Sequence, residues 1–310
     1  MKPVGASAPG KALLCGEYAV LDGTPAIVSA VDRRAFVRWS HLELPMPPEV
    51  AATLDLARKE CGDVPGTLQL DASALRLDRV KLGLGSSAAA AAATAAAVFA
   101  THGHDLADIE SRNRIFDCAY RGHASIAPRG SGVDVAASTF GGFLRFARVD
   151  GQLEIRPLGC PSKLLLRLIW TGHASRTSEL LAALRGFRDR DRGAYDALLA
   201  RLGEIGSAFA TAFEAGRARD VVCRATSYGE AMRELGDAAR APIVDVQLQR
   251  VADLAARFSG GAKPSGAGGG DVAVAFFTDA DAASGFEMAC KEEGLHPIDV
   301  LWGATGVLAR

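Results

Sequence analysis

Apolar runs alternate with glycine-, proline- and charge-rich segments along most of this chain. In the first half, short apolar or β-branched runs predict strands at residues 12–14, 26–28, 34–37 and 141–146. Longer stretches with helical spacing predict helices at residues 50–59, 87–100 and 108–120. A turn is predicted at residues 22–25, and a glycine-rich loop is predicted at residues 129–132. This half therefore indicates a mixed sheet with helices.

The second half begins with a continuous apolar run at residues 164–170, which is suited to a buried strand. A long helical region is predicted from residue 178 to about residue 236. The remaining predicted elements are a helix at 244–258, a loop at 259–271, a strand at 272–277, a helix at 280–293 and a strand at 298–301. We predict an α+β protein of two domains, residues 1–160 and 161–310, because the chain exceeds the usual size of one hydrophobic core.

Composition narrows the class of protein. The chain has 310 residues, of which 49% are hydrophobic and 23% charged, with a formal net charge of −1. These values are ordinary for a soluble globular protein and suggest neither a nucleic-acid nor a membrane-surface role. The longest weakly apolar run, residues 88–100, is too short to span a bilayer of about 30 Å.

Six cysteines are scattered, without a Cys-x-x-Cys pair and without clustering with the six histidines. This distribution argues against a disulfide framework and against a structural zinc site. Reduced thiols in the cytoplasm fit best, so we expect a cytoplasmic protein. The cysteines are Cys15, Cys61, Cys118, Cys160, Cys223 and Cys290.

The segment Val80–Ser87 leads straight into an alanine-rich helix. Gly83 and Gly85 allow a positive φ and close approach of the backbone, and Ser86 or Ser87 can cap the helix. The free N–H groups of the first turn would face an anion with the helix dipole behind them. One serine hydroxyl would remain free to bind Mg²⁺. The segment therefore predicts a phosphate-binding turn.

Other interpretations of this segment are weaker. A dinucleotide-binding fingerprint needs an acidic residue that closes a second strand, whereas Asp105 lies in a predicted loop between helices and Asp108 at the end of that loop. A Walker loop needs Gly-Lys-Ser/Thr, and the nearest approach, residues 5–11, is followed by Ala12. Helix capping without any ligand stays open on this segment alone.

Three glycine-bearing segments occur in order along the chain. They are residues 9–11 with 16–20, residues 83–87, and residues 263–271. Together they resemble the three motifs of the GHMP kinase superfamily. Lys81 before the glycine turn, residues 130–136 and residues 170–177 resemble the phosphomevalonate kinase branch. Mevalonate kinases have a magnesium-binding glutamate eleven residues before the catalytic aspartate, and His123 stands at that position here.

The resemblance implies Mg²⁺-dependent transfer of the ATP γ-phosphoryl group to 5-phosphomevalonate, a step of the mevalonate pathway of isoprenoid synthesis. Asp134 holds the position of the catalytic aspartate, as a base or as a group that orients Lys11 or the substrate, because a phosphate acceptor already offers an oxyanion. Lys11 would neutralise charge near the reacting centre. Ser87 would bind Mg²⁺. The predicted ATP phosphate-binding residues are Gly83, Leu84, Gly85, Ser86, Ser87 and Ala88.

An anionic acceptor requires further cations. Those near the matched motifs are Lys81, Arg129, Arg145, His173 and Arg176, and Lys81 and Arg176 are the preferred pair. The predicted acceptor-binding residues are Lys81, Ser131, Arg176, Gly268 and Gly269.

The resemblance implies a domain like domain 2 of ribosomal protein S5, followed by a ferredoxin-like domain, with both small-molecule substrates bound between them. Alternatives are a kinase for mevalonate or a sugar, a non-catalytic metabolite sensor and, more weakly, a dinucleotide oxidoreductase.

Overall fold

A computed structural model describes residues 3–42, 45–64, 66–78, 80–126, 128, 130–149 and 152–310. Contacts divide the chain into two compact units. Unit 1 comprises the chain up to Lys11, Val28–Leu144 and Leu301–Arg310, and unit 2 comprises Ala12–Ile27 and Arg145–Val300. The domain boundary at residue 160 stays a prediction.

The main sheet has the strand order β12-β1-β2-β6-β7, and β3 pairs with β2. Its strands are β1 (Ala6–Cys15), β2 (Ala26–Ser40), β3 (Thr67–Asp71), β6 (Phe143–Val149), β7 (Gln152–Leu158) and β12 (Leu308–Ala309). Strands β1, β2 and β6 begin in one unit and continue into the other. The prediction of two separate strands at 26–28 and 34–37 is wrong, because both segments belong to the single strand β2. The exposed Asp32 interrupts the apolar run, but the strand continues through it. The Asp32 N–H donates to the Leu301 carbonyl at 3.2 Å.

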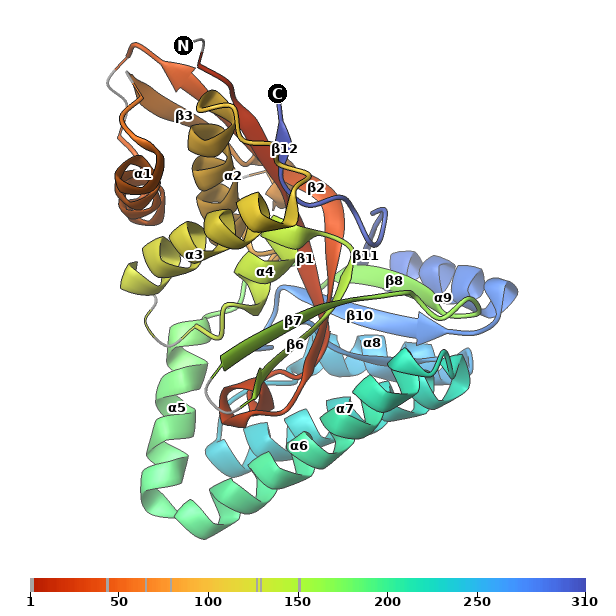
Figure 1. Ribbon diagram of the computed structural model, residues 1–310. Coiled ribbons are helices and arrows are strands. Elements are labelled where there is room, and N and C mark those ends of the chain that lie inside the picture. The colour runs from red at the N-terminus through yellow and green to blue at the C-terminus, as the bar shows by residue number, and fades with distance from the viewer. Residues whose placement is uncertain are drawn as a thin grey trace. The chain divides into compact units, whose positions relative to one another are not determined.

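Helix α2 (Ser86–Thr101) is the buried centre of unit 1. It packs against α1 (Pro48–Cys61), α3 (Ile109–Ile126) and α4 (Val133–Phe140), which surround it in Figure 1. Its run of alanines lets neighbouring helices approach closely at native packing density. A short helix η2 (Ser73–Leu75) and the hairpin β4 (Arg76–Leu77) and β5 (Val80–Lys81) precede it. The three helices predicted in this half are confirmed. Their ends differ by one or two residues, except that α3 ends six residues later than predicted.

Unit 2 contains an antiparallel sheet with the order β11-β8-β10-β9. Its strands are β8 (Leu165–Trp170), β9 (Gly261–Pro264), β10 (Val272–Phe277) and β11 (His296–Ile298). The strands predicted at 164–170 and 272–277 are confirmed. The loop predicted at 259–271 is wrong in part, because β9 is a buried strand despite its glycine and proline. At Gly261 a Cβ would lie 2.3 Å from the Thr226 hydroxyl, so close passage of a helix explains the glycine. The strand predicted at 298–301 lies earlier, as β11.

The longer helices described in this unit are α5 (Thr177–Arg190), α6 (Arg192–Glu214), α7 (Ala218–Ala239), α8 (Val246–Arg257) and α9 (Ala280–Glu292). Helix α5 packs on α6 and α7. Helices α6 and α7 lie side by side, as Figure 1 shows. Strand β10 is buried on both faces. Its Phe277 packs in a cluster with residues of α8 and α9, whereas the Phe276 ring meets Phe209 of α6 at 5.8 Å. A short helix η1 (Ala19–Asp22) completes the unit.

All six cysteines are free thiols. Within the described ranges, none of the helices combines the length and the apolar character needed to cross a membrane.

Candidate functional site

The glycine turn before α2 has the backbone that the sequence predicted. Gly83 and Gly85 have φ values of 76° and 73°. Gly85 itself is the N-cap of α2, and no side chain caps the helix, so capping by Ser86 or Ser87 is wrong. Both serines instead occupy the first turn and are partly exposed. The first N–H groups of α2 therefore lack a side-chain cap, which is the property that suits an anion.

Lys11 lies directly against this turn. Its backbone N–H donates to the Leu84 carbonyl at 3.0 Å, and its Nζ donates to the Gly83 carbonyl at 3.3 Å. Gly85 is needed here as well, because a Cβ would lie 3.1 Å from Lys11 Cγ and 3.7 Å from Asp134 Cβ. The structure thus brings Lys11, the glycine turn and Asp134 together, although they are far apart in sequence.

Asp134 stands in the first turn of α4. The N-cap of α4 is Gly132 with φ 90°, so Asp134 follows the cap and does not itself cap the helix. Its Oδ1 accepts the Val135 N–H at 3.0 Å, and the side chain is partly exposed. Ser131 accepts the Val133 N–H at 3.4 Å in the same loop. The carboxylate is therefore held at the start of a helix, and Asp134 Cβ and the Lys11 side chain both lie close to Gly85.

Ser87 has a partner that the sequence did not reveal. Its Oγ lies 3.1 Å from Nε2 of His123 on α3. In the tautomer with an unprotonated Nε2, the hydroxyl donates to the ring and keeps its oxygen lone pairs for another partner. The spacing of eleven residues before Asp134 singled out His123, but its contact with Ser87 depends on how α2 and α3 pack.

The cationic side chains predicted to bind the acceptor do not all lie in one place. Lys81 is exposed on the short hairpin strand β5. Arg145 is engaged by Glu154 and Glu214, at 3.3 and 3.1 Å. Arg176 is highly exposed and paired with Glu179 at 3.3 Å. Arg129 lies outside the described residues.

In unit 2 the glycine-rich loop, residues 265–271, folds closely onto its own surroundings. The N–H of Gly269 donates to the Ile243 carbonyl at 2.8 Å, and a Cβ on Gly268 would lie only 2.0 Å from that oxygen. These two predicted acceptor-binding glycines therefore have a packing reason of their own.

A second loop, residues 171–176, is hydrogen-bonded to the glycine-rich loop. The Asp271 N–H donates to the His173 carbonyl at 2.9 Å, and the Ser175 hydroxyl donates to the Gly268 carbonyl at 2.5 Å. His173 Nε2 in turn lies 2.9 Å from Asp245 Oδ2. Arg176 is the last residue of this loop and the N-cap of α5, and its side chain is solvent-exposed.

Sequence reasoning missed a buried charge pair beneath the glycine-rich loop. Lys263 Nζ lies 2.5 Å from Glu17 Oε1, and both side chains are almost completely buried. Glu17 Oε1 also accepts the Gly266 N–H at 3.2 Å. The hydroxyl of Tyr18, a residue with φ 63°, donates to the Ala267 carbonyl. The segment Gly16–Tyr18 is thus a support for the loop at 265–271.

Comparison with known proteins supplies the family. The GHMP kinase N-terminal domain family matches residues 50–142. Over 341 aligned residues the chain is 30% identical to the phosphomevalonate kinase of Streptomyces sp. strain CL190, covering 89% of this chain and 90% of that protein. The chain belongs to the GHMP kinase family. Members of this family are phosphotransferases that use ATP.

Two further relatives of this GHMP kinase bear different substrate names. The mevalonate kinase of Aeropyrum pernix is 28% identical, over 91% of each protein. The structure of Streptococcus pneumoniae phosphomevalonate kinase in complex with phosphomevalonate and AMPPNP has a TM-score of 0.81 at 18% identity, covering 96% of this chain and 99% of that one. The structural likeness confirms the predicted GHMP kinase fold.

Proposed function

We propose that this GHMP kinase transfers the γ-phosphoryl group of ATP to 5-phosphomevalonate in the mevalonate pathway. The observation that carries the proposal is the histidine eleven residues before Asp134. In this structure its ring engages Ser87 instead of offering a carboxylate to a metal ion. The likeness to a phosphomevalonate kinase over nine-tenths of both chains supports the same acceptor.

The reaction needs positioning and charge neutralisation more than covalent chemistry. An oxygen of the acceptor phosphate forms a bond to the γ-phosphorus while the bond from phosphorus to the bridging oxygen of ADP breaks. In our proposal the N–H groups at Gly85–Ala88 hold the ATP phosphates, and Lys11 stabilises the charge on the transferred group. Asp134, which like Lys11 lies near Gly85, would orient Lys11 or the substrate. A phosphate acceptor has already lost its proton at neutral pH, so a base is not required.

Mg²⁺ would reduce the repulsion between the anionic reactants. The described residues contain no group of three His, Cys, Asp or Glu side chains that could hold a metal ion. This fits Mg²⁺, which usually takes only one or two protein ligands and completes its shell with phosphates and water. The Ser87 hydroxyl fits as one such ligand, because donation to His123 leaves its oxygen free toward a cation. We therefore propose Ser87 as the protein ligand.

The acceptor is proposed to contact Lys81, Ser131, Arg176, Gly268 and Gly269. Lys81 and Arg176 would supply the positive charge that a phosphorylated acceptor needs and that mevalonate lacks. Mevalonate kinase activity is the second candidate, since several relatives of similar coverage are mevalonate kinases.

The test is ADP release from ATP and Mg²⁺ with 5-phosphomevalonate and mevalonate offered separately. We expect turnover with the phosphorylated acceptor alone. Turnover with mevalonate alone would overturn the proposed acceptor but leave the ATP site standing. Lys81→Gln should raise the KM for the acceptor with little change in the KM for ATP, whereas the exposed Lys163→Gln serves as the matched control. An unchanged acceptor KM in Lys81→Gln would remove that residue from the acceptor site.

A further inference from the structure

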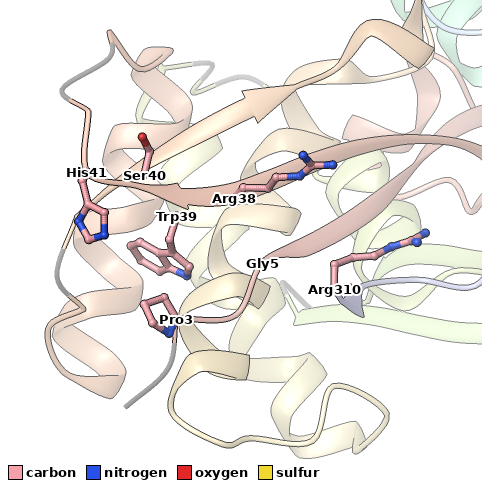
Figure 2. A pocket seen from close by; sticks show the side chains of 7 residues that line it. All are labelled: Pro3, Gly5, Arg38, Trp39, Ser40, His41 and Arg310. Carbon is pink, nitrogen blue, oxygen red and sulfur yellow. The ribbon is translucent and has the colours of Figure 1, made fainter.

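A hollow of about 440 Å³ lies in unit 1, where the chain enters β1. Seven residues line it: Pro3, Gly5, Arg38, Trp39, Ser40, His41 and Arg310 (Figure 2). Two of them are arginines and one is histidine, and none of these lining residues is acidic. Two permanently cationic side chains therefore meet at this hollow, in a chain with a net charge of −1.

The floor of the hollow is Gly5, which lies between the backbones that carry the two arginines. The Arg310 N–H donates to the Gly5 carbonyl at 2.8 Å. On the other side, a Cβ on Gly5 would lie 2.8 Å from the Val37 carbonyl and 3.8 Å from Arg38 Cα. Backbones two strand spacings apart are separated by about 10 Å. Gly5 therefore fits tightly between the two backbones, and Figure 2 shows both arginine side chains extending to the same side of it.

Both guanidinium groups are available for a ligand. Neither Arg38 nor Arg310 forms an ion pair with any carboxylate in the described part of the chain. The Arg310 guanidinium lies over the Phe36 ring at 5.2 Å, which places it without using its N–H donors. Asp71 on β3 is the acidic group that Arg38 influences, but hydrogen bonds from Ser73 are the main cause of its lowered pKa. Arg34, by contrast, is buried and spends its donors on backbone and hydroxyl oxygens.

The other side of the hollow carries two apolar groups, the Trp39 indole and the Pro3 ring, together with Ser40 and His41. Figure 2 shows Trp39 and Pro3 next to each other, away from the two guanidinium groups. The Trp39 Nε1 already donates to the Val4 carbonyl at 3.0 Å and the Thr101 hydroxyl at 3.1 Å. Only the apolar part of the indole can therefore contact a ligand. The hollow thus has one end with two guanidinium groups and another where the indole and the Pro3 ring lie near His41.

We propose that this hollow binds a small organic phosphate, with Arg38 and Arg310 holding the phosphate group and Trp39 and Pro3 contacting its organic part. Arginine suits this task because its planar fork donates two parallel hydrogen bonds to phosphate oxygens. The site uses none of the residues proposed for phosphoryl transfer. It is therefore a second binding site whose existence does not depend on the proposed acceptor.

The test is calorimetry and tryptophan fluorescence on the full chain, with saturating AMPPNP and Mg²⁺ to fill the nucleotide site. The probes are phenyl phosphate, inorganic pyrophosphate and phenol. We expect phenyl phosphate to bind most tightly. Arg38→Gln and Arg310→Gln should each weaken its binding at least about tenfold, because each loses charged hydrogen bonds. Trp39→Phe should abolish the change in fluorescence.

The control is Arg192→Gln, which removes an exposed arginine outside the hollow. Near-UV circular dichroism and kinase turnover should be unchanged in the Arg38 and Arg310 variants. Binding that is unaffected by both substitutions would overturn the site. Phenol binding as tightly as phenyl phosphate would overturn the role of the arginines, and pyrophosphate binding as tightly would overturn the role of Trp39 and Pro3.

Discussion

Replacing Glu17 by glutamine should destabilise unit 2 strongly while barely changing the shape of the side chain. At 2.5 Å the attraction between Glu17 and Lys263 is about 7 kcal/mol with an effective dielectric constant near 20. Desolvation of the two charges, at several kcal/mol per ion, offsets much of this gain. Breaking the pair from one side removes the attraction but keeps the desolvation of the remaining charge. We therefore expect Glu17→Gln to lower the free energy of unfolding by about 3 to 5 kcal/mol.

Removing both charges should cost less than removing one. In Lys263→Met the Glu17 carboxylate stays buried, and its Oε2 already has no hydrogen-bond partner among the described atoms. In Glu17→Gln the Lys263 Nζ keeps its hydrogen bonds to the Leu13 and Pro264 carbonyls, at 3.3 and 2.6 Å. The double variant leaves no buried charge, so its loss should be about 1 to 2 kcal/mol. The coupling energy from the double-mutant cycle should then be several kcal/mol.

The assay is urea unfolding monitored by near-UV circular dichroism. It compares the unchanged protein with Glu17→Gln, Lys263→Met and the double variant. The exposed pair Arg192–Asp196, at 3.5 Å, is the matched control, and Arg192→Gln should change the free energy of unfolding by less than about 1 kcal/mol. Additive losses in the Glu17 and Lys263 variants would refute the reasoning. Such a result would mean that packing and backbone hydrogen bonds, rather than the charge pair, hold the glycine-rich loop.

Three further outcomes are expected. Asp134→Ala should lower kcat by at least about a hundredfold if the carboxylate organises the reacting groups, and a near-normal kcat would exclude that role. Arg34→Lys should lower the free energy of unfolding in urea by about 2 to 4 kcal/mol, because lysine cannot make the hydrogen bonds that the Arg34 guanidinium donates to four oxygens. Burial, and secondarily Arg310, lowers the pKa of Arg34 to about 10. Burial raises the pKa of Cys118 and Cys290 to about 12, so at pH 8.5 fewer than about one in a thousand of these thiols is ionised and exposed Cys223 should react with a thiol reagent first. Equal labelling rates in mass spectrometry would contradict that burial.

The glycine turn before α2 could be predicted from sequence because its cause is local. Positive φ is easily reached only by glycine, so two glycines before a helix indicate where the backbone must turn. The serine cap was wrong for a related reason. Gly85 adopts the left-handed conformation at the N-cap itself, which moves Ser86 into the helix and frees both hydroxyls from the capping role.

The supports of the site could not be predicted, because their causes lie far apart in sequence. Glu17 and Lys263 are separated by 246 positions, and nothing in either local pattern marks a buried charge. Strand β9 was missed because Gly261 and Pro264 are typical of loops. Its strand conformation depends on pairing with β10 and on the close passage of α7. Local propensity was overridden by tertiary packing in both places.

The glycines of the three motifs do not all carry the same information about ligands. A Cβ on Gly85 would meet Lys11 and Asp134, which are themselves the proposed catalytic groups, so this glycine keeps the reacting groups close together. A Cβ on Gly268 would instead meet the Ile243 carbonyl at 2.0 Å, within the supporting structure. Gly268→Ala would therefore damage the loop whether or not the loop binds an acceptor. Substitutions at exposed Lys81 and Arg176 change charge without this strain, and for that reason they are the sharper test of the acceptor site.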